Sequence, residues 1–213
     1  MAKPQATKKP RAQFRRATPD ERSRQLGEAT IRCIRKKGNA GVSARQIAAE
    51  AGVTQGLITH YFGEVNELVA YAFNLMADDI LDAIVAAAHA GPATPQGRLD
   101  AYIEASFSPA IFDQDVLRVW VVFWGLILHS PRMSMSQQKE YSSFVATIET
   151  LLSDLAAAEG FAIRDTRLAA VAFNALLDGL WLAWCLNPAA FQPEEGAALC
   201  QQWVEGLRRG AYA

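Results

Sequence analysis

Residues 42–62 read "VSARQIAAEAGVTQGLITHYF", and this stretch decides the fold. Ser43 with Gln46 three residues later predicts a capping box at the start of a short helix, and Gly52 predicts its end. Thr54 predicts the start of a second helix of similar length, which runs to the end of the stretch. Two helices of about eight residues joined by a glycine turn form the helix-turn-helix pattern.

Small and apolar residues within this stretch fit the packing that the motif requires. Ala48 must be small because the second helix crosses over it, and Gly52 can take the left-handed conformation of a sharp turn. Val53, Ile58 and Phe62 are expected to fill the wedge between the helices. A plain helical hairpin would share the short apolar helices, so the charge around the motif becomes important.

The formal net charge of −1 hides a strong asymmetry along the chain. Residues 1–62 hold 13 Lys/Arg and 4 Asp/Glu, a net charge of +9, whereas residues 63–213 hold 8 Lys/Arg and 18 Asp/Glu, a net charge of −10. A basic segment followed by an acidic one suggests that one part of the protein meets a polyanion and the other does not. Together with the helix-turn-helix pattern, the charge favours DNA binding.

The rest of the chain is expected to be helical. Residues 1–17 lack apolar periodicity and predict a flexible basic arm, and Thr18, Pro19 and Glu21 predict the capped start of the first helix. No window alternates with period two, so we expect an all-α fold of about nine helices. Beyond residue 63, helices are expected over residues 64–90, 98–107, 116–129, 141–155, 164–186 and 192–209, with a loop at 91–97. The expected parts are the arm (1–17), a DNA-binding domain (18–63) and a ligand-binding and dimerisation domain (64–213).

The stretch "VSARQIAAEAGVTQGLITHYFGEVNEL" (42–68) resembles the signature of the TetR family of bacterial transcription repressors. The match covers the three N-terminal helices and the start of the fourth. The rest of the chain is similar in helix layout and length. The resemblance implies a homodimer that binds a palindromic double-stranded DNA operator. It also implies an inducer pocket in the C-terminal domain and a dimer interface made by the last two helices of each subunit.

The resemblance also implies which residues touch DNA. Gln55 and Thr59 lie four apart on one helix face and could reach base edges, while Leu57 could contact a thymine methyl. Gly56 permits a close approach to the DNA backbone. His60 and Tyr61 are expected at phosphates. The positions that commonly touch DNA in the family correspond to Ser43, Thr54, Gln55, Gly56, Leu57, Thr59, His60 and Tyr61.

One position departs from the family pattern. The family usually has a Lys in the first turn of the fourth helix, where this chain has Val65, so one phosphate contact is expected to be missing. The basic arm, with Arg15 and Arg16, is expected to compensate by following the DNA backbone or entering the minor groove.

The C-terminal segment carries most of the aromatic side chains. Such stripes at helical spacing usually fill a core, and this alternative stays open for each residue. The helix over residues 164–186 is apolar on nearly all sides and must bury two faces, which in the family layout meet the dimer partner and the ligand cavity. Asp178 needs a partner there: Arg118, a helix end, a subunit contact or a cationic ligand. Ligand contacts are expected from Tyr102, Phe107, Trp120, Phe123, Trp124, Asn174, Asp178 and Trp181.

The segment "ALLDGLWLAW" (175–184), together with "GLITHYF" (56–62), resembles the BetI branch of the family, whose members govern glycine-betaine synthesis from choline. A quaternary ammonium held by Trp rings is physically sensible, at about 2 kcal/mol or more for each desolvated cation–π contact. The resemblance therefore implies a choline-like inducer, although related segments occur at the dimer interface of relatives with other ligands.

The sequence gives little support for an enzyme, a membrane protein or a secreted protein. The three histidines are scattered, no catalytic constellation or glycine-rich phosphate loop stands out, and no enzyme activity, cofactor or metal is expected. The longest apolar run, residues 119–128, is too short to span a bilayer, and no secretory signal is recognisable, so a cytoplasmic protein is expected. Three distant cysteines are expected to be reduced structural thiols. A ligand-independent DNA-binding or protein-interaction factor with a filled C-terminal core is the alternative function.

Overall fold

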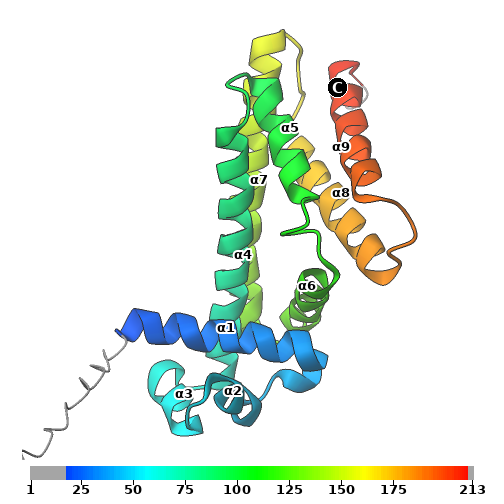
Figure 1. Ribbon diagram of the computed structural model, residues 1–213. Helices are drawn as coiled ribbons and strands as arrows, with labels where there is room; N and C mark the ends of the chain where they lie inside the picture. The colour runs from blue at the N-terminus through cyan, green and yellow to red at the C-terminus, as the bar shows by residue number, and fades with distance from the viewer. Residues whose placement is uncertain (1–17, 211–213) are drawn as a thin grey trace, which may run out of the picture.

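The computed structural model describes residues 18–210, and within this range every regular element is a helix (Figure 1). The expectation of an all-α fold is therefore confirmed for the described part of the chain. In chain order the elements are α1 (Pro19–Lys37), the 3₁₀ turn η1 (Gly38–Gly41), α2 (Ala44–Ala51), α3 (Gln55–Phe62), α4 (Val65–Ala90), α5 (Pro95–Ser106), α6 (Gln114–Ile127), α7 (Pro131–Glu159), α8 (Thr166–Leu186) and α9 (Pro193–Arg208).

The first three helices surround a small core of their own, which also receives the start of α4. The expected capping box begins α1, since the Glu21 amide donates to Thr18 Oγ1 at 3.2 Å and the Thr18 amide donates to Glu21 Oε2 at 2.7 Å. Ala48 and Ile58 are almost fully buried between the helices, as the spacing predicts. The buried side chains of this core are Leu26, Ala29, Cys33, Ile47, Ala48, Ile58 and Leu68.

The turn between α2 and α3 has the expected conformation. Gly52 has φ 66° and ψ 33°, the left-handed region in which a Cβ is unfavourable. The Val53 amide donates to the Ala48 carbonyl at 2.9 Å and closes the end of α2.

The capping box expected at the start of α2 is only half formed. Ser43 Oγ accepts from the Gln46 amide at 3.3 Å, but the Ser43 amide donates to the Gly41 carbonyl at 2.9 Å. Because the preceding 3₁₀ turn takes this donor, the Gln46 side chain has no role in the cap, and its buried Oε1 lacks a partner among the described residues.

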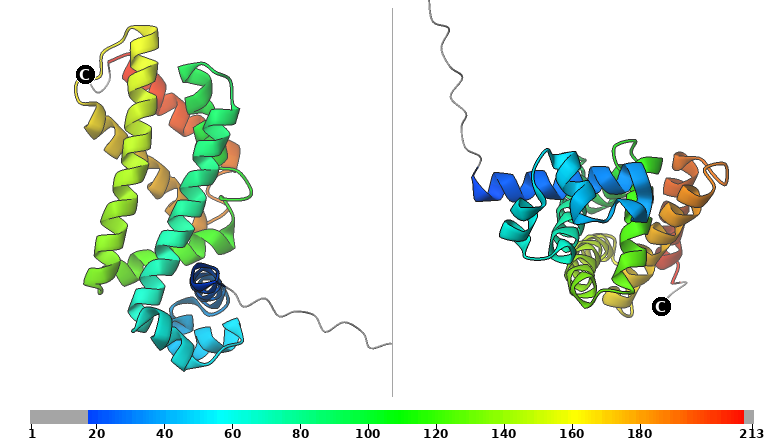
Figure 2. Two further views of the ribbon diagram at one scale, coloured as in Figure 1. Left: turned by 90° about the vertical axis from the view of Figure 1, so that its left-hand side faces the viewer. Right: turned by 90° about the horizontal axis from the view of Figure 1, so that it is seen from below.

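Two long helices, α4 and α7, lie side by side and form the spine of the larger part (Figures 1 and 2). The α1 helix crosses the lower end of this spine and packs against α4, with α2 and α3 beneath it. The α6 helix contacts α1 as well as α7 and α8, so it connects the DNA-binding part to the larger core. The α8 and α9 helices cover the side away from α4.

Three helices, α5, α6 and α7, begin earlier than the sequence pattern predicted. The loop at 91–97 is shorter than expected, because Thr94 Oγ1 accepts from the Gly97 amide at 3.0 Å and α5 begins at Pro95. The helix expected near 141–155 is α7, which begins at Pro131. Pro131 therefore starts this helix, with Ser130 as its cap, as well as following the end of α6.

By length and composition, α8 could cross a membrane, and it is the described helix that meets this test. In the folded chain it packs against α6, α7 and α9. Its middle carries Asn174 and Asp178, which donate and accept a hydrogen bond at 3.0 Å. These contacts fit a core helix of the C-terminal bundle.

Candidate functional site

The α3 helix presents a polar face outward from a buried anchor. Ile58 is 1% exposed and fixes α3 to the small core, while Tyr61 is half-buried against the same core. Leu57 is also half-buried, and Ser43 is half-buried at the start of α2. Five of the residues assigned to DNA by resemblance are exposed together at the start and outer face of α3: Thr54, Gln55, Gly56, Thr59 and His60.

Gly56 has no packing role within the protein. A Cβ built at this position would meet nothing closer than Thr54 Oγ1 at 3.8 Å, and the backbone is ordinary helix. Glycine is unfavourable within a helix, at about 1 kcal/mol relative to alanine. The packing of the described residues therefore does not require a glycine at this position.

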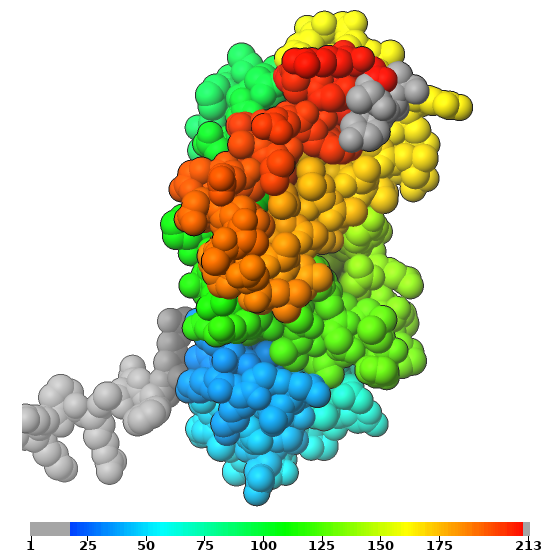
Figure 3. Space-filling model, turned by 90° about the vertical axis from the view of Figure 1, so that its right-hand side faces the viewer, coloured from blue at the N-terminus to red at the C-terminus, as the bar shows by residue number. Residues whose placement is uncertain are grey.

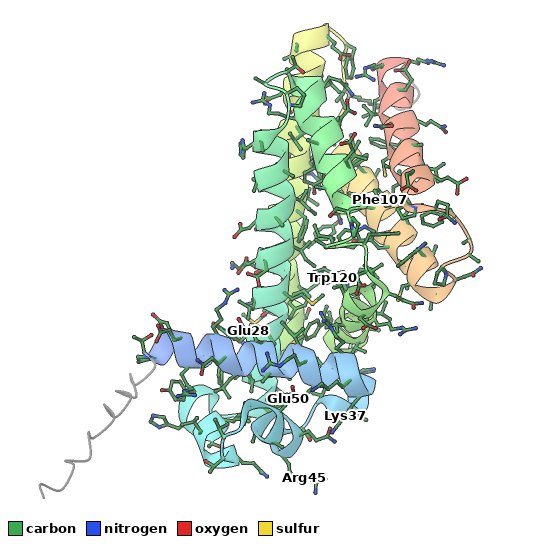
Figure 4. The ribbon with its side chains drawn as sticks, viewed as in Figure 1. Glu28, Lys37, Arg45, Glu50, Phe107 and Trp120 are labelled. Carbon is green, nitrogen blue, oxygen red and sulfur yellow. The ribbon has the colours of Figure 1, made fainter. Side chains whose placement is uncertain are left out.

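The sequence analysis did not single out Arg45, an exposed cation on this side of the molecule. Figure 4 shows Arg45 projecting away from α2 at the base of the structure. Among the described residues it makes no ion pair, unlike Arg32 and Lys36, which both contact Glu50 at 3.2 Å and 2.8 Å. Hydrogen bonding from Lys36 lowers the pKa of Glu50. Arg32 and Lys36 thus tie α1 to α2, whereas Arg45 is available to a phosphate.

The other residues that the sequence analysis discussed as DNA contacts are Val65, Arg15, Arg16 and Thr54. Val65 begins α4, is half-buried and packs against both cores, so an apolar contact occupies the position where the family usually has a Lys. Arg15 and Arg16 lie outside the described residues. Thr54 takes the cap position of α3 with extended backbone, but its side chain makes no capping hydrogen bond. Its hydroxyl is therefore free to face a partner.

A cavity lies within the C-terminal helices, between α4, α5, α6, α7 and α8. About 510 Å³ of space lies between its lining residues when the open solvent at its mouth is counted, but only about 40 Å³ of this can hold the centre of a water molecule. Half of its lining residues are aromatic. The lining residues are Phe73, Ile84, Tyr102, Ser106, Trp120, Trp124, Gln137, Glu140, Tyr141, Phe144, Asn174, Leu177, Asp178 and Trp181.

Six of the eight residues predicted at the ligand lie together in this wall, namely Tyr102, Trp120, Trp124, Asn174, Asp178 and Trp181. Phe123 and Phe107 do not. Phe123 is fully buried and packs edge-on against Phe73 with ring centroids 5.5 Å apart, so it fills the core. Phe107 packs against Phe112 at 5.1 Å and beside Gly196 of α9. Figure 4 shows Phe107 well above Trp120, at the level of α8 and α9.

The tryptophans of the wall are arranged around Trp120. Its ring is 6.3 Å from that of Trp124 and 6.5 Å from that of Trp181, both close to edge-on. Trp181 Nε1 donates to the Ser106 carbonyl at 3.1 Å, which fixes that ring. Trp120 is 6% exposed, and its Nε1 has no hydrogen-bond partner among the described residues. The wall therefore offers aromatic faces and one buried donor.

Asp178 is the carboxyl that the sequence analysis placed at the ligand. Burial raises the pKa of Asp178 to about 6, and the hydrogen bond from Asn174 Nδ2 opposes this shift. Arg118 was one expected partner, but it pairs with Asp115 at 3.5 Å on the exposed side of α6. A helix end is excluded as well, since Asp178 lies in the middle of α8.

Glu140 is a second carboxyl in the wall that the sequence analysis missed. It is 2% exposed, and burial is the main cause that raises its pKa, with Asp78 of α4 adding to the effect. Lys139 contacts the Glu140 carboxylate at 3.2 Å, and the Lys139 side chain is 70% exposed. A Glu within an amphipathic helix normally faces solvent, so only the packing of α7 against α4 could reveal this position.

A stripe of apolar side chains remains exposed on α8 and α9. Leu168 is 51% exposed and Leu186 is 73% exposed, at opposite ends of α8, and Leu199 of α9 is 44% exposed. Between the two leucines of α8, the exposed positions are the small residues Ala172, Ala175, Gly179 and Ala183. Figure 3 shows α8 and α9 forming one continuous face of the molecule.

The fold defines the class: a helix-turn-helix carried on a larger helical bundle that contains a cavity is typical of bacterial one-component transcriptional regulators. Residues 26–72 match the model of bacterial regulatory proteins of the tetR family, and residues 95–209 match that of the C-terminal domain of BetI-type transcriptional repressors. The chain belongs to the TetR family and carries a BetI-type C-terminal domain. It is a DNA-binding transcriptional regulator rather than an enzyme.

Similar proteins cover nearly the whole chain. The HTH-type transcriptional regulator BetI of Serratia proteamaculans is 30% identical over 194 residues, which are 89% of this chain and 93% of that protein. A crystal structure of a transcriptional regulator from Pseudomonas aeruginosa PAO1 is 38% identical with a TM-score of 0.85, covering 94% of this chain and 96% of the other. A regulator from Saccharomonospora viridis, solved in complex with choline, is 22% identical with a TM-score of 0.74 over 87% and 96% of the two chains.

Proposed function

We propose that this protein is a repressor that binds a palindromic operator as a homodimer and releases it when a small organic cation enters the C-terminal cavity. The observation that carries the DNA-binding half is the exposed start of α3, where Gln55, Gly56 and Thr59 face outward over a rigid core. The α3 helix would enter the major groove, with Gln55 and Thr59 at base edges. Arg45 and the helix-start amides would contact phosphates. Such a repressor acts in the cytoplasm.

The exposed stripe on α8 and α9 supports a homodimer. Leucines at both ends of α8 with small residues between them allow two copies of the helix to approach closely. Covering these leucines would remove apolar area from water, which favours association at about 25 cal/mol per Å². A twofold dimer matches a palindromic site, because each subunit then presents one α3 helix to one half-site.

The cavity supports a choline-like inducer. Its wall combines Trp faces, which attract a quaternary ammonium, with the buried carboxyl of Glu140 and the half-buried carboxyl of Asp178, which favour a positive partner. The choline complex of the Saccharomonospora viridis regulator is consistent with this class of ligand. The BetI-type C-terminal domain further supports control of glycine-betaine synthesis.

The alternative of a ligand-independent factor requires a filled C-terminal core. A cavity lined by Trp120, Trp124 and Trp181 argues against it. The buried, unpaired indole donor of Trp120 argues in the same direction, since a core built without a ligand normally satisfies such groups.

Binding-site selection from random DNA, followed by fluorescence anisotropy with the selected duplex, tests the DNA-binding proposal. We expect Gln55→Ala to weaken binding by about 1–3 kcal/mol and to relax selectivity at one base pair. Arg45→Ala should weaken binding to all sequences and flatten the salt dependence. Gln138→Ala, at an exposed glutamine on α7, is the matched control and should bind as the wild type. No enrichment of any sequence, or equal effects of Gln55→Ala and Gln138→Ala, would contradict the proposal.

A further inference from the structure

The cavity wall contains two carboxyls and no basic side chain. Asp178 comes from α8 and Glu140 comes from α7, and the other twelve lining residues are aromatic, aliphatic or neutral polar. Two acids in a wall whose lining residues include seven aromatic side chains and no Lys, Arg or His form an environment that disfavours an anion and favours a cation.

The charged groups around the cavity do not neutralise its two carboxyls. Lys139 contacts Glu140 Oε1 at 3.2 Å but is 70% exposed, so solvent screens its charge. Asp78, an exposed residue of α4, faces the same carboxyl and opposes the effect of Lys139. Asp178 has only the neutral Asn174 as a hydrogen-bond partner among the described residues. Neither carboxyl is therefore neutralised from within the cavity.

We propose that Glu140 is a specificity-determining residue, which makes the cavity accept an organic cation and reject the zwitterion that carries a carboxylate on the same ammonium. This inference rests on the proposed binding of a cation in this cavity. The aromatic wall alone attracts a trimethylammonium group whether or not a carboxylate is attached to it. Discrimination needs a like charge that repels the ligand's own carboxylate, and the acids on α7 and α8 place such a charge in the wall from two helices. Asp178 attracts the ammonium group of either ligand. Glu140 adds a second negative charge, which repels the carboxylate of the zwitterion.

The test compares choline chloride with glycine betaine by isothermal titration calorimetry, using the full-length protein. We expect the wild type to bind choline at least about tenfold more tightly than glycine betaine. Glu140→Gln keeps the shape and removes the charge, and it should weaken choline binding and bring the two affinities to within a few-fold of each other. Glu140→Asp should restore much of the discrimination because it restores the charge.

Glu149→Gln is the matched control, since it makes the same change on α7 at a half-exposed residue outside the cavity. It should leave the affinity ratio unchanged. A wild type that binds choline while Glu140→Gln keeps the full ratio would overturn the role of Glu140 and leave the proposed function intact. A wild type that binds neither compound, while still binding its operator, would overturn both the cationic inducer and this inference. A lower melting temperature shared by Glu140→Gln and Glu140→Asp, with the ratio lost in both, would indicate a merely structural residue.

Discussion

Asp178 lies in the wall of the cavity as a carboxyl without an ion-pair partner among residues 18–210. Partial burial makes its ionisation unfavourable, and the proposed cation would offset this cost because a carboxylate that has lost hydration gains from a charged partner. The sequence analysis found this residue because it interrupts an apolar helix. It did not find Glu140, since α7 carries many polar residues and a Glu there has no signal of its own.

The raised pKa of Asp178 makes the stability of the free protein depend on pH. Below about pH 4 the carboxyl is protonated in both the folded and the unfolded chain, and above about 6 it is ionised in both, at a cost to the folded state. We expect Asp178→Asn to raise the free energy of unfolding at pH 7.5 by on the order of 1–2 kcal/mol. The gain should shrink by half or more at pH 4.5. Urea denaturation of both proteins at the two pH values measures it, and an equal gain at both would contradict a titrating Asp178.

At the scale of elements, the helix starts show what the sequence could and could not reveal. A Thr or Ser followed by Pro begins α1, α5 and α7, and the sequence analysis used this signal only at Thr18 and Pro19. Thr94 with Pro95 and Ser130 with Pro131 are also a capping residue followed by proline, so the starts of α5 and α7 could have been predicted from the sequence. The incomplete capping box of α2 could not be predicted from the sequence, because the Ser43 amide donates to the Gly41 carbonyl of the preceding 3₁₀ turn instead.

Two glycines of the helix-turn-helix should respond in opposite ways to alanine. Gly52 has a positive φ and open space around it, so Gly52→Ala should cost about 1 kcal/mol of stability through the backbone alone. Gly52→Asn should cost less, because Asn tolerates this conformation. Gly56→Ala should leave stability unchanged or improve it by up to about 1 kcal/mol, yet weaken operator binding. Thermal unfolding and anisotropy separate the two effects, and a Gly56→Ala protein with full operator affinity would show that Gly56 faces no DNA.

In the whole molecule, α6 and α4 connect the cavity to the helix-turn-helix. The α6 helix supplies Trp120 and Trp124 to the cavity and also contacts α1 and η1 beside the helix-turn-helix. The α4 helix supplies Phe73 and Ile84 to the cavity, and its first turns pack into the small core. The sequence pattern predicted the helices, but it could not show which aromatic faces enclose space, because that depends on how five helices pack together.

The proposed homodimer involves the exposed stripe of α8 and α9. We expect Leu168→Glu with Leu186→Glu to convert the dimer to a monomer, because each places a charge on the exposed stripe of α8. Operator affinity should fall by at least about tenfold, since one subunit holds only one half-site. Leu128→Glu, at an 80% exposed leucine after α6, is the control and should stay dimeric. Sedimentation velocity gives the oligomeric state, and a double variant that remains dimeric would place the interface elsewhere.

We propose above that a cation in the C-terminal cavity controls DNA binding by α3. The most direct measurement is the anisotropy of the selected operator duplex, bound to the wild-type protein and titrated with choline chloride, with sodium chloride as the ionic-strength control. We expect choline to release the duplex at concentrations where sodium chloride does not, and Asp178→Asn to need at least about tenfold more choline. Operator affinity that stays constant while choline saturates the protein would contradict the claim.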